Sequence, residues 1–172
     1  MATITYTSRE EIEVHKFSIV ATVGIPLLAI FFQAYVSSRL TFLKLFDLPL
    51  IVTIFFAVSR RSQMAGMLTG CAIGLTQDAL THLPIGIYGI SKTIVGYAAS
   101  SIGVKIDVDN PGSRFLMMFA FTLLHDGLYF IVSRQLLGLA SDWRVFHELS
   151  AALANAILAV VLFTFMDRAK RR

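Results

Sequence analysis

The chain has 172 residues, of which 56% are hydrophobic and only 15% are charged, against about 25% charged residues in an average soluble domain. Together with a mean hydropathy of +0.71 and a single cysteine, Cys71, this composition excludes an ordinary cytosolic enzyme, a disulfide-rich secreted domain and a disordered protein. The net charge of +4 could indicate nucleic-acid binding, but the positions of the basic residues favour a role in membrane orientation.

Six apolar stretches predict six membrane-spanning helices. A helix needs about 20 apolar residues to cross a bilayer, and strand alternation typical of a membrane β-barrel is absent. The predicted spans are 17–36, 48–58, 64–80, 85–104, 114–139 and 149–166. The segments between them are too short to fold alone. The sequence therefore predicts an all-α membrane protein, a single six-helix transmembrane domain over residues 1–172 that forms a compact bundle.

The first two spans raise separate questions. The acidic residues Glu10, Glu11 and Glu13 precede span 17–36, so this span is interpreted as a retained helix and not as a signal peptide. Span 48–58 reaches only about 16 Å. Asp47 as N-cap and Pro49 in the first turn favour a helix that begins after Asp47. The alternative is a helix from Leu40 that is kinked near Pro49.

Span 64–80 carries a row of small residues. Gly66, Gly70, Gly74 and Asp78 recur every four residues, which places them on one face of the helix. Glycines in such a row let another helix approach closely. Two interpretations stay open at this point: packing inside the bundle, or a surface for a partner helix.

Span 85–104 repeats this pattern with Gly89, Lys92 and Gly96 on one face. Only a short turn joins it to span 64–80, so the two helices are predicted to be antiparallel neighbours. Asp78 and Lys92 then differ in depth by about 6–7 Å, a gap that the long lysine side chain can largely cover, and an ion pair between them is predicted. In the alternative, Asp78 accepts hydrogen bonds from Thr81 or from tyrosine hydroxyls and Lys92 reaches elsewhere.

The remaining polar groups inside the spans are Gln33, in span 17–36, and three residues of the last two spans. His125 and Asp126 lie in span 114–139, and Asn155 lies in span 149–166. A polar packing layer is predicted for them; a metal site, which needs three or four converging ligands, and a proton relay are the alternatives. Searches for metalloprotease, nucleophile-elbow and phosphate-loop motifs find none. The sequence therefore predicts no catalytic residue, no cofactor and no metal.

The basic residues predict the orientation of the bundle. With six spans both termini lie on the same side, and ten lysines and arginines lie on that side: Arg9, Lys16, Arg60, Arg61, Lys105, Arg114, Arg168, Lys170, Arg171 and Arg172. Four lie on the other: Arg39, Lys44, Arg134 and Arg144. The positive-inside rule therefore predicts cytoplasmic termini. The pair Arg60–Arg61 and the basic tail are interpreted as cytoplasmic anchors, not as a nucleic-acid site.

The region 47–99 resembles the MreD family of bacterial rod-shape membrane proteins. The resemblance rests on Asp47 with the apolar run after it, Arg60–Arg61, the glycine row that ends at Asp78, the turn 83–86, and the pair Gly96–Tyr97. His125–Asp126 falls where the family often has an Asp. Lys92 is not a residue that the resemblance requires.

The resemblance implies a non-enzymatic subunit of the inner (cytoplasmic) membrane. Such proteins bind MreC, which has a single span and a periplasmic coiled coil, and they help couple MreB filaments to RodA and its class B penicillin-binding transpeptidase in cell-wall synthesis. The face of spans 64–80 and 85–104 is the expected docking surface. The resemblance also implies a fold similar to the substrate-binding subunit of energy-coupling-factor vitamin transporters. That transporter subunit is the alternative function; a membrane-embedded enzyme and a small channel are further rivals.

Overall fold

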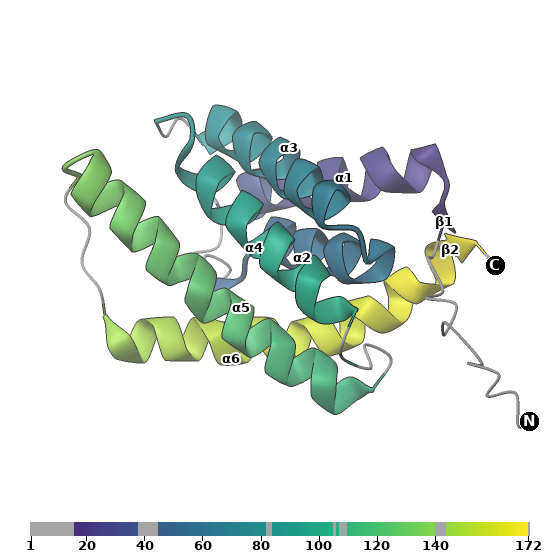
Figure 1. Ribbon diagram of the computed structural model, residues 1–172. Coiled ribbons are helices and arrows are strands. Elements are labelled where there is room, and N and C mark those ends of the chain that lie inside the picture. Colours follow the sequence, from purple (N-terminus) through teal and green to yellow (C-terminus); the bar gives the residue numbers. More distant parts are fainter. Residues whose placement is uncertain are drawn as a thin grey trace, which may run out of the picture.

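The computed structural model describes residues 16–37, 45–81, 84–104, 106, 110–139 and 144–171. Within these residues the chain forms six α-helices (Figure 1). They are α1 (Ile19–Ser37), α2 (Leu48–Arg60), α3 (Gln63–Thr81), α4 (Ile87–Gly103), α5 (Pro111–Ile131) and α6 (Val145–Met166). A π-helical segment, η2 (Val132–Leu136), continues α5, and a short 3₁₀ turn, η3 (Asp167–Ala169), follows α6. Each α-helix overlaps one of the predicted spans.

Two short strands accompany the helices, and the sequence analysis did not predict them. β1 (Lys16–Phe17) and β2 (Lys170–Arg171) pair antiparallel, with Lys16 opposite Arg171. Two-residue strands leave no periodic pattern in a sequence, because alternation becomes visible only over about four residues. The pairing joins the chain just before α1 to the chain just after α6 (Figure 1).

α2 is the central helix of the bundle, although it is the shortest of the six. Every residue from Pro49 to Ser59 is buried, and α2 packs against α1, α3 and α4. It begins at Leu48, and the Asp47 side chain accepts a hydrogen bond from the backbone N–H of Leu50 (2.9 Å). Residues 40–44, which the kinked alternative requires, lie outside the described residues. Because helices surround α2, it does not need the length of a lipid-facing span.

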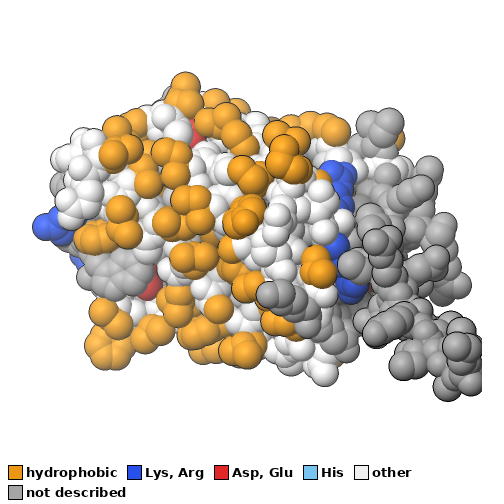
Figure 2. All heavy atoms as spheres, viewed as in Figure 1, with side chains coloured by type: hydrophobic (Ala, Val, Ile, Leu, Met, Phe, Trp, Pro, Cys, Tyr) orange, Lys and Arg blue, Asp and Glu red, His pale blue; other side chains and the backbone are white. Residues whose placement is uncertain are grey.

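The outer surface of the bundle is apolar. Large side chains of α1 and α6 stand exposed, among them Val20, Leu28, Phe31, Ile157 and Phe165. Figure 2 shows hydrophobic side chains over the middle of one face, with lysine and arginine side chains toward its two ends. Two helical stretches, Pro111–Leu136 and Val145–Met166, are long and apolar enough to cross a bilayer by length and composition. An apolar surface of this extent fits a lipid environment better than water.

The two ends of the bundle differ, and each is named here by what lies on it. The terminal end carries β1, β2, the end of α2 and the start of α5; the loop end carries residues 45–47, the turn between α3 and α4, and the start of α6. At the terminal end Arg114 of α5 pairs with Asp167 (2.7 Å), an ion pair that the sequence analysis missed because Asp167 lies outside the predicted spans.

Candidate functional site

Asp78 holds the start of α4 from the end of α3. Its carboxylate is fully buried and accepts backbone N–H bonds from Gly86 (2.8 Å), Tyr88 (3.0 Å) and Gly89 (3.1 Å). These N–H groups lie at the start of α4, where backbone N–H groups have no acceptor within the helix. A buried anion at a helix N-terminus is also favoured by the helix dipole. Gly86 adopts φ 114, a conformation that suits glycine.

The predicted Asp78–Lys92 ion pair is wrong. Lys92 Nζ instead contacts Asp47 Oδ2 at 2.6 Å, and Asp78 binds backbone N–H groups as described above. The alternative predicted that Lys92 reaches a group other than Asp78, and this part is confirmed. The prediction assumed that a lysine long enough to reach a buried carboxylate on the neighbouring helix pairs with it, whereas Asp78 accepts from backbone donors at the start of α4.

The glycine row of α3 packs directly onto α4. A Cβ atom at Gly70 would overlap the carbonyl oxygen of Lys92, and one at Gly74 would overlap the carbonyl of Tyr88. Gly66 and Gly96 face each other in the same way, since a Cβ on either would overlap the backbone oxygen of the other. We call this contact of Gly66, Gly70 and Gly74 with α4 the glycine seam. The seam is filled by α4, so a partner helix has no access to these residues.

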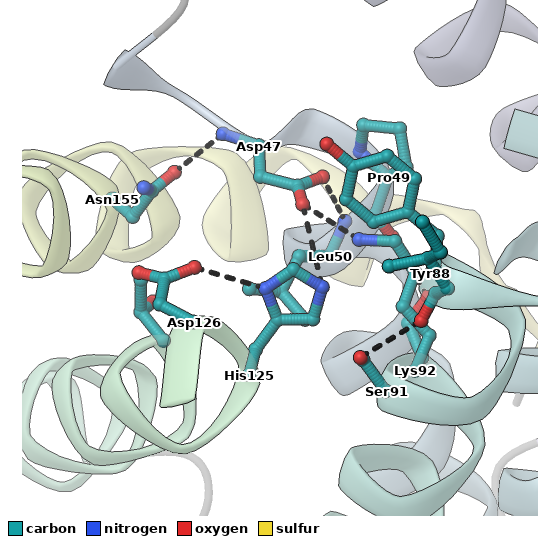
Figure 3. Close-up of polar contacts among 12 residues, drawn as sticks. Asp47, Pro49, Leu50, Tyr88, Ser91, Lys92, His125, Asp126 and Asn155 are labelled. Carbon is teal, nitrogen blue, oxygen red and sulfur yellow. Dashed lines mark hydrogen bonds and ion pairs between the residues drawn. The ribbon is translucent and has the colours of Figure 1, made fainter. Parts of the chain in front are cut away.

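Side chains of three helices, α1, α4 and α6, converge on the residues that precede α2, and we call this contact the junction. Lys92 of α4 binds the Asp47 carboxylate (2.6 Å) and lies over the Tyr88 ring, 5.3 Å from its centroid. Asn155 of α6 accepts from the backbone N–H of Asp47 (2.9 Å) and donates to the carbonyl of Leu45 (3.1 Å). Figure 3 shows Asp47 between Asn155 on one side and Lys92 on the other.

Gln33 of α1 completes this junction. Its amide donates to the carbonyl of Phe46 (2.8 Å) and accepts from the N–H of Leu48 (3.3 Å). Gln33 and Asn155 thus hydrogen-bond the backbone of residues 45–48 and fix the start of α2. A buried peptide group needs such a hydrogen-bond partner. No pattern in the sequence indicates this junction, because its hydrogen bonds join residues up to 110 positions apart.

His125 and Asp126 lie next to the junction, on α5. His125 Nδ1 is 3.0 Å from Asp126 Oδ1, and His125 Nε2 is 3.9 Å from Asp47 Oδ2. Figure 3 shows the His125 ring between these two carboxylates. The ring stacks on Tyr88, with centroids 5.9 Å apart. Within the described residues no group of three or more His, Cys, Asp or Glu side chains is placed to hold a metal ion.

A polar cavity of about 290 Å³ opens beside these residues at the loop end. Its walls come from α1, α3, α4, α5 and α6 together with residues 45–47, which precede α2. The polar side chains that line it are Gln33, Asp47, Gln77, Tyr88, Thr122, His125, Asp126, Tyr129, His147, Glu148 and Asn155. We call this the polar cavity. Gln77 and Glu148 were not singled out from the sequence.

Two buried polar atoms of the polar cavity lack a hydrogen-bond partner among the described residues. They are Gln77 Oε1 and His125 Nε2, and the two side chains are 5% and 2% exposed. An unpaired buried polar atom costs about 1–3 kcal/mol. Polar atoms left in this state typically mark a place where a ligand, a partner or water completes the bonding.

An apolar groove lies at the other end of α5. Its volume is about 360 Å³, and Ile102, Ile106, Leu116, Met117 and Phe121 contribute to its walls between α4 and α5. Its surface is almost entirely hydrocarbon, in contrast to the polar cavity.

The predicted basic anchors lie at the terminal end where the structure describes them. Arg60 donates to the Thr22 hydroxyl of α1 (2.8 Å) and lies over Phe56. Arg61 ends α2 in a left-handed conformation with φ 50, and Arg168 lies over the Phe165 ring. Lys170 and Arg171 form β2. Arg172 lies outside the described residues.

The structure thus defines a class: a small helical bundle with an apolar exterior, whose interior polar groups mostly satisfy its own backbone and leave one polar cavity at the loop end. The chain belongs to the MreD family, because the family described as rod shape-determining protein MreD matches residues 15–169. It is therefore a rod shape-determining membrane protein. No curated protein and no solved structure matches the chain, so the likeness to energy-coupling-factor subunits stays a prediction.

Proposed function

We propose that the chain is a non-enzymatic adaptor of the inner membrane that binds MreC at the loop end and helps couple MreB filaments to RodA and its transpeptidase. The observation that carries the proposal is the polar cavity, with its unpaired Gln77 and His125 atoms. The glycine seam, which the sequence analysis favoured for docking, is occupied by α4. The proposed binding surface for MreC is therefore at the loop end and not at the glycine seam.

The orientation of the bundle supports this assignment. The terminal end carries Arg60, Arg114 and Arg168, and the positive-inside rule places such an end in the cytoplasm. The polar cavity then faces the outside of the membrane. MreC, with one span and a periplasmic coiled coil, presents the chain just beyond its span to that face. Multi-pass insertion with cytoplasmic termini is part of the proposal.

The test is co-purification of MreC with variants that fill one cavity or the other. Ala151 lines the polar cavity and Ala120 lines the apolar groove, so Ala151→Phe and Ala120→Phe place the same side chain in two different cavities. Ala151 is buried and Ala120 is exposed, so the folding check below is essential for Ala151→Phe. We expect Ala151→Phe to lose MreC in mild detergent and Ala120→Phe to keep it. Size-exclusion chromatography of both variants confirms that they remain folded.

Three outcomes count against parts of the proposal. If the wild-type chain does not retain MreC, the adaptor function is wrong. If Ala120→Phe loses MreC while Ala151→Phe retains it, the docking surface is the apolar groove. Reporter fusions that place the C-terminus outside the cytoplasm would overturn the orientation.

The polar cavity also keeps the transporter-subunit alternative open to test. A substrate subunit needs a ligand pocket at the outer face, and a polar cavity of about 290 Å³ lies at the low end of the range for small-molecule sites. Native mass spectrometry of the purified chain distinguishes the two functions. A vitamin-sized mass retained in the absence of any partner protein would favour the transporter subunit and overturn the adaptor.

A further inference from the structure

The unpaired Gln77 oxygen of the polar cavity is a hydrogen-bond acceptor. Gln77 Oε1 can only accept. His125 Nδ1 lies 3.0 Å from Asp126 Oδ1, so this ring nitrogen donates to the carboxylate. Both side chains are nine-tenths or more buried, and both line the cavity. The group that completes this site must therefore be a donor.

The carboxylates that line the polar cavity also favour a positively charged occupant. Asp126 of α5 and Glu148 of α6 line the same cavity and interact with each other electrostatically. Asp47 is the third carboxylate on the wall; among the described residues Lys92 pairs with Asp47, and the His147 ring lies 3.4 Å from Glu148 Oε1. Two carboxylates held close together repel each other unless a cation or a shared proton lies between them.

From this geometry we infer that the polar cavity binds a cationic, donor-rich side chain of a protein partner, with an arginine guanidinium as the best match. The inference rests on the proposed docking at the loop end and adds the chemistry of the group that enters. Gln77, Asp126 and Glu148 accept its N–H bonds. Arginine fits because its planar guanidinium offers five donors that spread to acceptors on different walls.

The volume and the charge of the cavity favour a side chain over two other occupants. About 290 Å³ is small for a drug-sized ligand and suits one side chain. A lipid headgroup such as phosphoethanolamine carries an anion beside its amine, and its phosphate would lie against the Asp126 and Glu148 carboxylates. Repulsion between like charges in a largely buried site opposes that arrangement.

The direct test measures binding of small probes to the full chain, purified in detergent. The probes are N-acetyl-arginine amide, its neutral isostere N-acetyl-citrulline amide, and glycerophosphoethanolamine as the headgroup probe. Saturation-transfer NMR detects complexes as weak as millimolar. We expect saturation of the arginine probe alone. Equal saturation of the citrulline probe, or preferential saturation of the headgroup probe, would overturn the inference.

Variants then locate the binding site. Glu148→Gln and Gln77→Leu each remove one acceptor, and each is expected to weaken arginine-probe binding about tenfold or more, because charge-assisted and buried hydrogen bonds are lost. Asp167→Asn is the matched control: it removes one negative charge at the terminal end, where Asp167 pairs with Arg114. Unchanged binding in both cavity variants, or equal weakening in the control, would contradict the assignment.

The same variants separate this inference from the proposed function. If the arginine probe binds but wild-type chain retains no MreC, the cationic site stands and the adaptor function is wrong. If MreC co-purifies equally with wild type, Glu148→Gln and Gln77→Leu, the adaptor function stands and the cationic site is overturned.

Discussion

The glycine seam and the polar cavity lie on neighbouring parts of α3, yet they have opposite properties. In the seam, Gly70 and Gly74 bring the α3 and α4 backbones so close that even a methyl group would overlap a carbonyl oxygen. Three residues beyond Gly74, Gln77 faces the polar cavity with an unpaired oxygen. The comparison teaches that the small-residue face serves the fold of this chain, whereas unsatisfied polar atoms are what it offers to other molecules.

Breaking the seam should have the largest effect on folding. Gly70→Leu places a side chain against the Lys92 carbonyl, and because backbone cannot move aside as a flexible side chain can, we expect a loss of about 3 kcal/mol or more. Gly127→Leu is the control, since nothing lies within 4 Å of a Cβ at Gly127. Thermal unfolding in detergent should show a large drop for Gly70→Leu alone. Equal stability of the two variants would refute the seam.

The Asp47–Lys92 pair, which lies beside the polar cavity, gives a test of comparable size. Lys92→Met or Asp47→Asn leaves the other group without its partner, and breaking a buried pair costs about 3–5 kcal/mol. Lys92 is fully buried whereas the Asp47 side chain is 19% exposed, so Asp47→Asn, which strands the ammonium, should be the more damaging. The double variant should lose less than the sum of the two. Additive losses in a thermal-unfolding cycle would mean that the groups do not interact.

The comparison also shows which parts of this molecule a sequence can reveal. The helices were predictable because each apolar run is continuous along the chain, and the Asp47 N-cap was predictable because capping is local. The glycine pattern predicted a close helix contact but left its partner open. That partner is the next helix in the chain, which a short turn makes the nearest available surface.

The site was less predictable because its contacts are long-range. Asp47 and Lys92 are 45 positions apart, and no periodicity links a residue before one helix to a lysine in the middle of another. Asp78 was assigned to Lys92 from the reach of the lysine side chain alone, whereas its donors come from the backbone, which a list of side chains does not contain. Gln77 and Glu148 were overlooked because an uncharged amide and a helix-end acid carry no motif.

Asp78→Ala should destabilise the packing of α3 against α4, because Asp78 at the end of α3 holds the start of α4. It leaves the N–H groups of Gly86, Tyr88 and Gly89 without their acceptor, and buried unpaired donors should together cost about 3 kcal/mol. Asp78→Asn keeps one carbonyl acceptor and should fall between alanine and wild type. Denaturation and hydrogen exchange at the start of α4 measure both changes. A stable Asp78→Ala variant with protected α4 amides would contradict the capping role.

Gln77→Leu should have the smallest effect on stability. It tests the contrast between the glycine seam and the polar cavity on a single helix, α3. It removes the buried Oε1 atom that has no partner, and leucine keeps a similar shape, so stability should change by no more than about 1 kcal/mol, in the favourable direction. Gly74→Leu, one turn earlier on the same helix, should unfold the protein because its side chain would overlap the Tyr88 carbonyl. If Gln77→Leu were as damaging as Gly74→Leu in thermal unfolding, Gln77 would belong to the packed interior, and the unsatisfied oxygen would be part of the fold and not of a recognition site.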